Sequence, residues 1–265
     1  MKAFDSAYPY RLGLVSISFR DRTPEEILIA MQKAQLSYVE WGSDVHAPCR
    51  DKKRLAELVR LQNAYGITCS SYGTYFRLGE TPLEELTDYI AAAKILGTDI
   101  LRLWCGRKSG AACTEEEKKA LLAQCKAAAS IAEENNITFC LECHIKTFTE
   151  RMEDALWLIR EVESPYFQMY WQPNQFRTVE ENLTYAKAIS PYAKVLHVFN
   201  WKEHEKNPLA EAIDIWKDYL SCFDGSQTLL LEHMPDGKLA ALAREAEALV
   251  AIAMQAKNAA QTDFY

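Results

Sequence analysis

The chain has 265 residues, and its hydrophobic fraction of 49 % is ample for a large core. The formal net charge of −7 argues against binding to duplex nucleic acid, which needs a cationic surface against the phosphates. No apolar run approaches the ~20 residues of a membrane helix. The first eleven residues lack the hydrophobic segment of a secretory signal. We therefore expect a cytoplasmic protein that binds neither membrane nor nucleic acid.

Eight cysteines are scattered along the chain and are expected to be reduced thiols. Two of them, Cys140 and Cys143, form a CxxC sequence inside the apolar segment 137–144. If this segment is a strand, side chains three residues apart point to opposite faces. The two thiols then cannot close a disulfide or share a metal, so we interpret them as unrelated packing residues. The same alternation puts Glu142 and His144 on one face.

Short apolar runs alternate with longer amphipathic stretches along the whole sequence. The runs predicted to form strands are residues 11–19, 38–42, 67–73, 100–106, 137–144, 167–173, 193–201 and 227–234. Near-continuous apolar runs of this kind are typical of parallel strands that helices cover.

Helix starts are marked between these runs. Thr23 precedes a proline and a glutamate in the pattern of a capping box, and Thr81 repeats the pattern in a stretch that ends on Gly97. Thr114 opens the next helix with acidic residues in its first turn. Weaker starts lie near Thr149, Thr178, Asn207 and Pro235, and the last helix is expected at roughly residues 236–257.

Eight β-then-α units predict an α/β protein with one TIM-barrel domain, a (β/α)8 barrel, over residues 1–265. The alternative is a doubly wound open sheet. That fold usually carries a glycine-rich first turn for a nucleotide, and residues 18–26 contain no glycine. We see no linker or composition shift that would divide the chain.

Polar residues fall where the predicted strands end, which is where TIM barrels place their chemistry. Glu142, Gln172, His197 and Glu232 lie late in four consecutive strands. One such residue is more often a solvated strand end, but four are expected to face one centre. Two carboxylates, an imidazole and an amide oxygen suit a divalent metal ion such as Mn²⁺, Co²⁺, Zn²⁺ or Mg²⁺. Without a metal, at least one glutamate should have a raised pKa.

The sequence resembles the sugar phosphate isomerase/epimerase, or xylose isomerase-like, barrels over essentially its whole length. The resemblance rests on VEWGSDVH (39–46), LRLWCG (101–106), LECH (141–144), YWQP (170–173), LHVFNW (196–201) and LLEHM (230–234). In that family a metal is typically held by Glu, Asp, His and Glu on strands five to eight. These positions match Glu142, Gln172, His197 and Glu232. Gln172 departs from the usual acid and predicts weaker metal binding or a different metal preference.

The resemblance implies a divalent-metal-dependent isomerase or epimerase of carbohydrate metabolism that acts on an open-chain ketose or related polyol. A proton would be transferred at the carbon next to the carbonyl, with Glu142 and Glu232 as catalytic acid–base groups and metal ligands. An inosose-dehydratase-like lyase and a degenerate, non-catalytic sugar-binding barrel stay open as alternatives. A DNA endonuclease that resembles the same fold would need a histidine-rich cluster for three zinc ions. The chain has only five histidines and a net negative charge, so we disfavour this alternative.

Six further residues are predicted to bind the sugar substrate: His144, His46, Trp104, Asn174, Phe199 and Trp201. Because of the strand alternation, Trp41 and Trp171 are instead expected to face the helices. The loops after the seventh and eighth predicted strands contain lysines, but Glu203 and Glu205 offset their charge. This favours an unphosphorylated sugar or cyclitol as the substrate.

Arg102 is expected to point inward and pair with Glu40 in the core. Trp216, Tyr219 and Leu220 could serve a homo-oligomer interface, although we favour packing on the barrel.

Overall fold

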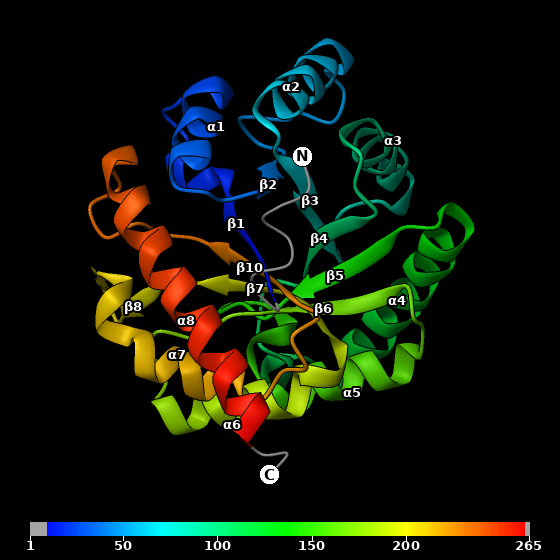
Figure 1. Ribbon diagram of the computed structural model, residues 1–265. Coiled ribbons are helices and arrows are strands. Elements are labelled where there is room, and N and C mark those ends of the chain that lie inside the picture. Colours follow the sequence, from blue (N-terminus) through cyan, green and yellow to red (C-terminus); the bar gives the residue numbers. More distant parts are fainter. Residues whose placement is uncertain (1–9, 263–265) are drawn as a thin grey trace.

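The computed structural model describes residues 10–262 and contains a closed barrel of eight parallel strands (Figure 1). The strands lie in the order β1-β10-β7-β6-β5-β4-β3-β2. They are β1 (Arg11–Val15), β2 (Tyr38–Gly42), β3 (Thr68–Leu78), β4 (Ile100–Cys105), β5 (Thr138–Glu142), β6 (Phe167–Trp171), β7 (Ala193–Val198) and β10 (Thr228–Leu231). The predicted TIM barrel is confirmed.

Eight helices surround the strands (Figure 1). They are α1 (Pro24–Lys33), α2 (Lys52–Tyr65), α3 (Leu86–Leu96), α4 (Glu115–Asn135), α5 (Met152–Val162), α6 (Val179–Ile189), α7 (Ile213–Leu220) and α8 (Leu242–Thr262). The last helix packs against both α7 and α1, which closes the outer ring.

Three helices begin with the capping boxes that short-range chemistry predicts. The hydroxyls of Thr23, Thr114 and Thr178 each accept a hydrogen bond from the backbone N–H three residues on. The glutamate at that position accepts the threonine's own N–H in return. Gly97, with φ of +81°, ends α3 in the left-handed conformation that glycine adopts without strain, as predicted.

Other predicted helix starts are wrong. The Thr81 hydroxyl accepts the N–H of Arg77 instead of capping a helix, and α3 begins only after a 3-10 turn at Leu83–Glu85. A 3-10 turn also precedes α7 and α8, so α8 begins at residue 242 rather than 236. These 3-10 turns move the start of each α-helix further along the chain, and capping patterns in the sequence do not predict them.

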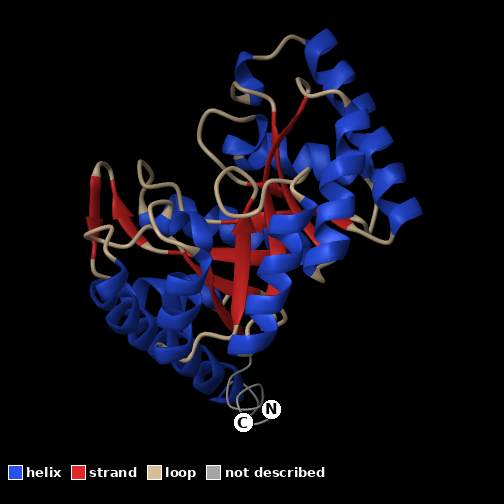
Figure 2. Cartoon of the chain, turned by 90° about the horizontal axis from the view of Figure 1, so that it is seen from above, coloured by secondary structure: helices blue, strands red, loops and turns tan. Residues whose placement is uncertain are grey.

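Strand ends also differ from the prediction. The segment 11–19 stops being a strand at Val15 and turns into a 3-10 helix, Ser16–Phe19, whereas β3 runs on to Leu78. The segment 193–201 divides after Val198. Its end becomes β8 (Asn200–Lys202), which pairs antiparallel with β9 (Glu205–Asn207) in a hairpin that projects from the barrel (Figure 2).

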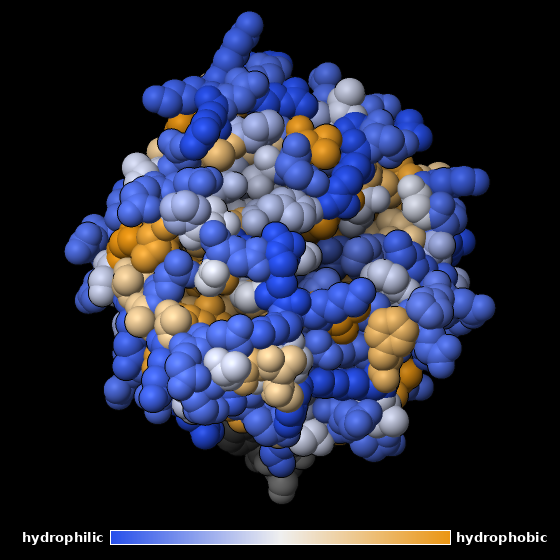
Figure 3. Space-filling view, turned by 180° about the vertical axis from the view of Figure 1, so that it is seen from behind, coloured by the Kyte–Doolittle hydropathy of each residue, from blue (hydrophilic) through white to orange (hydrophobic). Residues whose placement is uncertain are grey.

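The surface seen in Figure 3 is largely hydrophilic, with apolar residues in small separate patches. Within residues 10–262, no helix is long and apolar enough to cross a membrane. The expectations for the two chain ends fall largely on residues that lie outside the described range.

Gly13 is required where β1 meets β2 and β10. A Cβ atom there would lie 2.1 Å from the carbonyl oxygen of Tyr38 and 2.8 Å from a methyl carbon of Leu230. We expect Gly13→Ala to lower the free energy of unfolding by about 1–3 kcal/mol or more, because backbone cannot yield as a flexible side chain does. Urea denaturation followed by circular dichroism measures this. Ser130→Ala, on the exposed side of α4, is the control and should change stability by less than about 0.5 kcal/mol.

Candidate active site

Four polar residues sit at the carboxyl ends of neighbouring strands. Glu142 is the last residue of β5, Gln172 and Glu232 directly follow β6 and β10, and His197 is next to last in β7. The strand register sets their height, because Leu230 pairs with His197 and Glu232 lies two residues further along. All four therefore reach the same end of the barrel, as the sequence predicts.

The side chains converge on the imidazole of His197. Its Nδ1 atom lies 3.0 Å from Oε1 of Gln172, 3.4 Å from Oε2 of Glu232 and 3.6 Å from Oε1 of Glu142. The imidazole and both carboxylates are almost completely buried. Oε2 of Glu232 is buried and accepts no hydrogen bond within the described residues.

A second layer of charge lies beneath this cluster, inside the barrel. The Nε atom of Arg102 donates to Oε1 of Glu40 at 3.0 Å, and its Nη1 atom donates to Oε2 of Glu142. Oε2 of Glu40 also accepts the hydroxyls of Tyr170, at 2.8 Å, and Ser71, at 3.1 Å. The predicted pair of Arg102 and Glu40 is present, and Arg102 also bridges to the upper cluster.

This arrangement keeps the carboxylates ionised. Burial alone would raise the pKa of Glu142, but Arg102 holds that pKa well below its ordinary value. Burial also opposes ionisation of Glu232, yet His233 and His197 lower its pKa to about 2. The expectation that one glutamate has a raised pKa without a metal is therefore wrong. The sequence predicted that Arg102 forms a core ion pair but did not show that it also reaches Glu142.

Most of the predicted substrate-binding residues gather beside the cluster. A cavity of about 140 Å³ is lined by His144, Asn174, Phe199 and Trp201, together with His233 and Gln172. The ring of Trp104 stacks on His144 with centroids 4.7 Å apart. These five predicted residues therefore share one wall of the barrel mouth, and their roles in binding stay predictions.

His46 is placed apart from this group. Its ring is buried, with Nδ1 3.0 Å from the hydroxyl of Ser16 and Nε2 3.1 Å from the carbonyl oxygen of Arg22. Both ring nitrogens thus hold the loop after β2 against the loop after β1. A substrate hydroxyl would have to displace one of these contacts.

A family model described as xylose isomerase-like TIM barrel matches residues 29–244. The chain belongs to the xylose isomerase-like TIM barrel family. No curated protein matches it in sequence.

Solved structures share this fold at low sequence identity. A probable 3-DHS dehydratase, AsbF, involved in petrobactin synthesis in Bacillus anthracis, is 14 % identical, with 91 % of this chain and 98 % of that chain covered and a TM-score of 0.74. The IolI protein with a bound zinc atom is 14 % identical, over 92 % and 98 %, with a TM-score of 0.73. A D-psicose 3-epimerase with D-tagatose from Clostridium cellulolyticum H10 is 11 % identical, over 96 % and 98 %, with a TM-score of 0.62.

The donor atoms fit a divalent metal in type, and each of the three oxygens lies 3.0–3.6 Å from Nδ1 of His197. Ligands about 2.0–2.2 Å from a tetrahedral ion lie roughly 3.4 Å from one another. The unpartnered oxygen of Glu232 also calls for a cation or a donor. Within residues 10–262, no group of three or more His, Cys, Asp and Glu side chains is arranged to hold a metal by itself. A metal here would require these side chains to move closer together, and it would replace the contact between Gln172 and His197.

Two contributors to the site were missed in the sequence. Tyr170 lies two residues before Gln172 on the same face of β6, so strand alternation could have placed it inward. The side chain of His233 lies with Nε2 3.3 Å from Oε2 of Glu232. Alternation could not place it, because the chain turns at His233 with a φ of +58°.

Predictions about packing residues are confirmed. Trp41 donates to Gln62 of α2, and Trp171 packs against Trp216 and Tyr219 of α7, so both tryptophans face the helices. Cys140 and Cys143 are free thiols. They belong to different clusters, Cys140 to the barrel interior and Cys143 to the main core.

Removing Arg102 should destabilise the fold strongly, because two buried carboxylates lose their cation. We expect Arg102→Met to cost about 3–5 kcal/mol in urea unfolding. Adding Glu40→Gln and Glu142→Gln to that variant should recover much of the loss. Arg50→Met removes an exposed pair with Asp88 and should cost only about 0–1 kcal/mol. A small effect of Arg102→Met would contradict the paired arrangement.

Thiol reactivity should follow burial. Burial raises the pKa of Cys69 and Cys143 to about 12, so very little thiolate is present at about pH 8. The buried thiols at positions 69, 105, 125, 140 and 143 should resist an aromatic disulfide reagent in the native protein. The half-buried thiols of Cys49, Cys113 and Cys222 should react slowly. All eight should react after unfolding, and absorbance of the released thiolate gives the count.

Proposed function

We propose that this protein is a divalent-metal-dependent sugar isomerase or epimerase. It would act on an open-chain ketose or a related polyol and transfer a proton at the carbon next to the carbonyl. The observation that carries the proposal is the position of Glu142 and Glu232, which flank the same imidazole nitrogen from β5 and the end of β10. Proton removal and return at one carbon centre need acid–base groups placed in this way.

Glu142, Gln172, His197 and Glu232 are the residues that would hold the metal. A divalent ion at this place would polarise the substrate carbonyl and acidify the adjacent C–H bond. Because Gln172 is neutral, the set carries two formal negative charges, which a divalent ion would balance. Related structures named for a bound zinc or for an epimerase support this proposal through family membership.

Glu232 is the base in this proposal. Its Oε2 atom accepts no hydrogen bond within the described residues, so its lone pairs would be the ones to take a proton from the substrate carbon. Glu142 is oriented by Arg102 and would protonate or deprotonate from the other side. Trp104, stacked on His144, would pack against the C–H face of the sugar.

Dehydration is a second candidate, and the pairing of Arg102 with Glu142 favours it. Arg102 engages one oxygen of Glu142, whereas Oε2 of Glu232 accepts no hydrogen bond within residues 10–262 and has only the nearby nitrogens of His197 and His233, at 3.4 Å and 3.3 Å. Elimination of water needs one base for the carbon proton and one acid for the departing hydroxyl, rather than two matched bases. Glu232 and His144 would fill these two roles.

Proton transfer should depend on Glu232. In D₂O with D-fructose and added Mn²⁺, Co²⁺ or Zn²⁺, we expect deuterium to appear at the carbon next to the carbonyl, measured by NMR. Glu232→Gln should slow this exchange by about 100-fold or more, as loss of a catalytic base does. Glu153→Gln, an exposed residue on α5, is the matched control. A new absorbance of a conjugated carbonyl without exchange into a ketose would favour dehydration instead.

Metal content should respond to two substitutions in opposite directions. We expect about one equivalent of a transition metal per chain in the wild-type protein, measured by mass spectrometry of the element. Glu232→Gln should lower the affinity for that metal by about 100-fold, since it removes a ligand rather than a supporting residue. Gln172→Asp should retain or raise it, because the ligand set gains a charge. Metal bound only by Gln172→Asp would indicate a non-catalytic barrel.

A further inference from the structure

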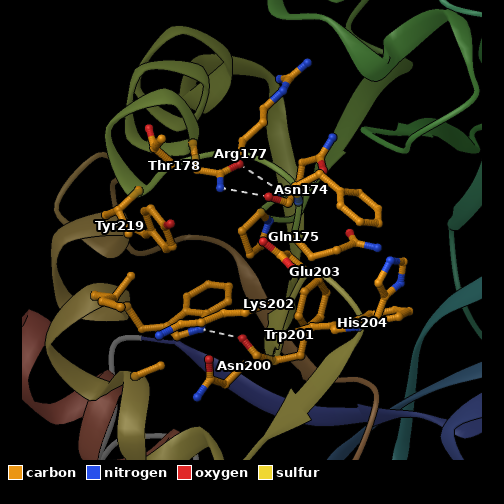
Figure 4. A pocket seen from close by; sticks show the side chains of 18 residues that line it. Asn174, Gln175, Arg177, Thr178, Asn200, Trp201, Lys202, Glu203, His204 and Tyr219 are labelled. Atoms are coloured by element: carbon orange, nitrogen blue, oxygen red, sulfur yellow. Dashed lines mark hydrogen bonds between the residues drawn. The ribbon is translucent and has the colours of Figure 1, made fainter.

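A second cavity lies beside the cluster and is larger than the cavity at the cluster itself. It has a volume of about 560 Å³ and lies between the loop after β6, the β8–β9 hairpin and helix α7 (Figure 4). The cavity at the cluster holds about 140 Å³. Small-molecule sites usually measure roughly 300–1,000 Å³, so the smaller cavity alone is too small for an extended substrate.

The two cavities share part of their walls. Pro173, Asn174, Gln175, Phe199 and Trp201 line both of them. The shared side chains therefore lie between the larger cavity and a ligand in the space beside His144. This adjacency makes the larger cavity a place for the remainder of a bound molecule.

One side of the larger cavity is aromatic and rigid. Trp216 and Tyr219 of α7 are both buried in the fold and lie nearly perpendicular, with ring centroids 5.5 Å apart. The indole N–H of Trp216 donates to the carbonyl oxygen of Phe199 at 2.9 Å, which fixes the ring. These buried rings form a fixed base for the cavity, and the exposed Phe176 and half-buried Trp201 in its lining are the rings that the C–H face of a sugar could contact.

The lining also carries four amide side chains, beside the charged side chains of Arg177, Lys202 and Glu203. Asn174, Gln175, Asn182 and Asn200 line the cavity. Nδ2 of Asn200 donates to the carbonyl oxygen of Pro208, and its Oδ1 atom receives no hydrogen bond within residues 10–262. Amide groups offer both donors and acceptors, which is what a run of hydroxyl groups requires.

Charge at the cavity does not favour a phosphate. Arg177 points away from it (Figure 4), donates to the carbonyl oxygen of Glu150 at 2.9 Å and lies over the ring of Tyr185. On the hairpin, Lys202 is followed directly by Glu203. An uncharged, hydroxyl-rich ring therefore matches the lining better than an anion.

We propose that this cavity is a subsite for a second sugar ring, attached to the substrate at the end remote from the reacting carbonyl. The substrate class is then a keto-disaccharide, and this extension rests on the proposed function. Phe199 and Trp201, which line both cavities, would lie at the bond between the two rings. The hairpin that supplies Trp201 is held in place by a 2.9 Å hydrogen bond from the N–H of Glu203 to the carbonyl oxygen of Gln175.

Calorimetric binding with metal-loaded protein tests this assignment. The probes are D-fructose and two keto-disaccharides, lactulose and isomaltulose. We expect at least one disaccharide to bind about tenfold more tightly than fructose, which corresponds to about 1.4 kcal/mol. Ile215→Trp places a large ring in the cavity from the half-buried side of α7 and should abolish that preference without changing fructose binding.

Two further variants make the result specific. Ile29→Trp adds the same ring on the exposed side of α1 and should leave the preference unchanged. Tyr219→Phe removes one hydroxyl, keeps the packing and should weaken disaccharide binding alone, which covers the case that Ile215→Trp does not fold.

The inference is overturned if neither disaccharide binds more tightly than fructose. It is also overturned if the preference survives in a folded Ile215→Trp variant. Failure of the proposed function has a different signature, namely no deuterium exchange into fructose with any metal. A disaccharide preference that Ile215→Trp removes would then still establish the subsite.

Discussion

The candidate site depends on Arg102, a cation buried at the centre of the barrel. Its guanidinium group is 2 % exposed and contacts carboxylates from β2 and β5. Three buried glutamates at one end of a barrel would repel one another strongly in a medium of low dielectric constant. Arg102 from below and His197 from above offset this repulsion. The barrel therefore keeps these carboxylates ionised although they are buried.

The same cation makes the two carboxylates of the cluster unequal. Glu142 is tied to Arg102, whereas an oxygen of Glu232 has no hydrogen-bond partner within the described residues. Groups with similar chemistry take different roles when their environments differ. In the proposed function, this asymmetry rather than the fold would decide between epimerisation and dehydration. Structures named as a probable dehydratase and an epimerase share the barrel at 14 % and 11 % identity, so the fold alone does not select the reaction.

The β8–β9 hairpin forms part of a second cavity beside the one at the strand ends. It separates the small cavity at the cluster from the larger cavity over α7, and it contributes Trp201 to both. Loops at the carboxyl ends of barrel strands can vary without disturbing the core beneath them. In the proposed function, the hairpin would set the size of the accepted substrate independently of the carboxylate cluster.

The sequence by itself determined the eight β-then-α units and the meeting of Glu142, Gln172, His197 and Glu232 at one end. Strand alternation and the closure of parallel strands leave few other arrangements. It also determined three helix starts, because a capping box is a contact across three residues. Only the tertiary structure decided that Tyr170 reaches Glu40, 130 residues away, and that Arg102 bridges to Glu142. Alternation fixes the face on which a side chain lies, whereas distances across a barrel depend on strand stagger and side-chain rotamers, which long-range packing sets.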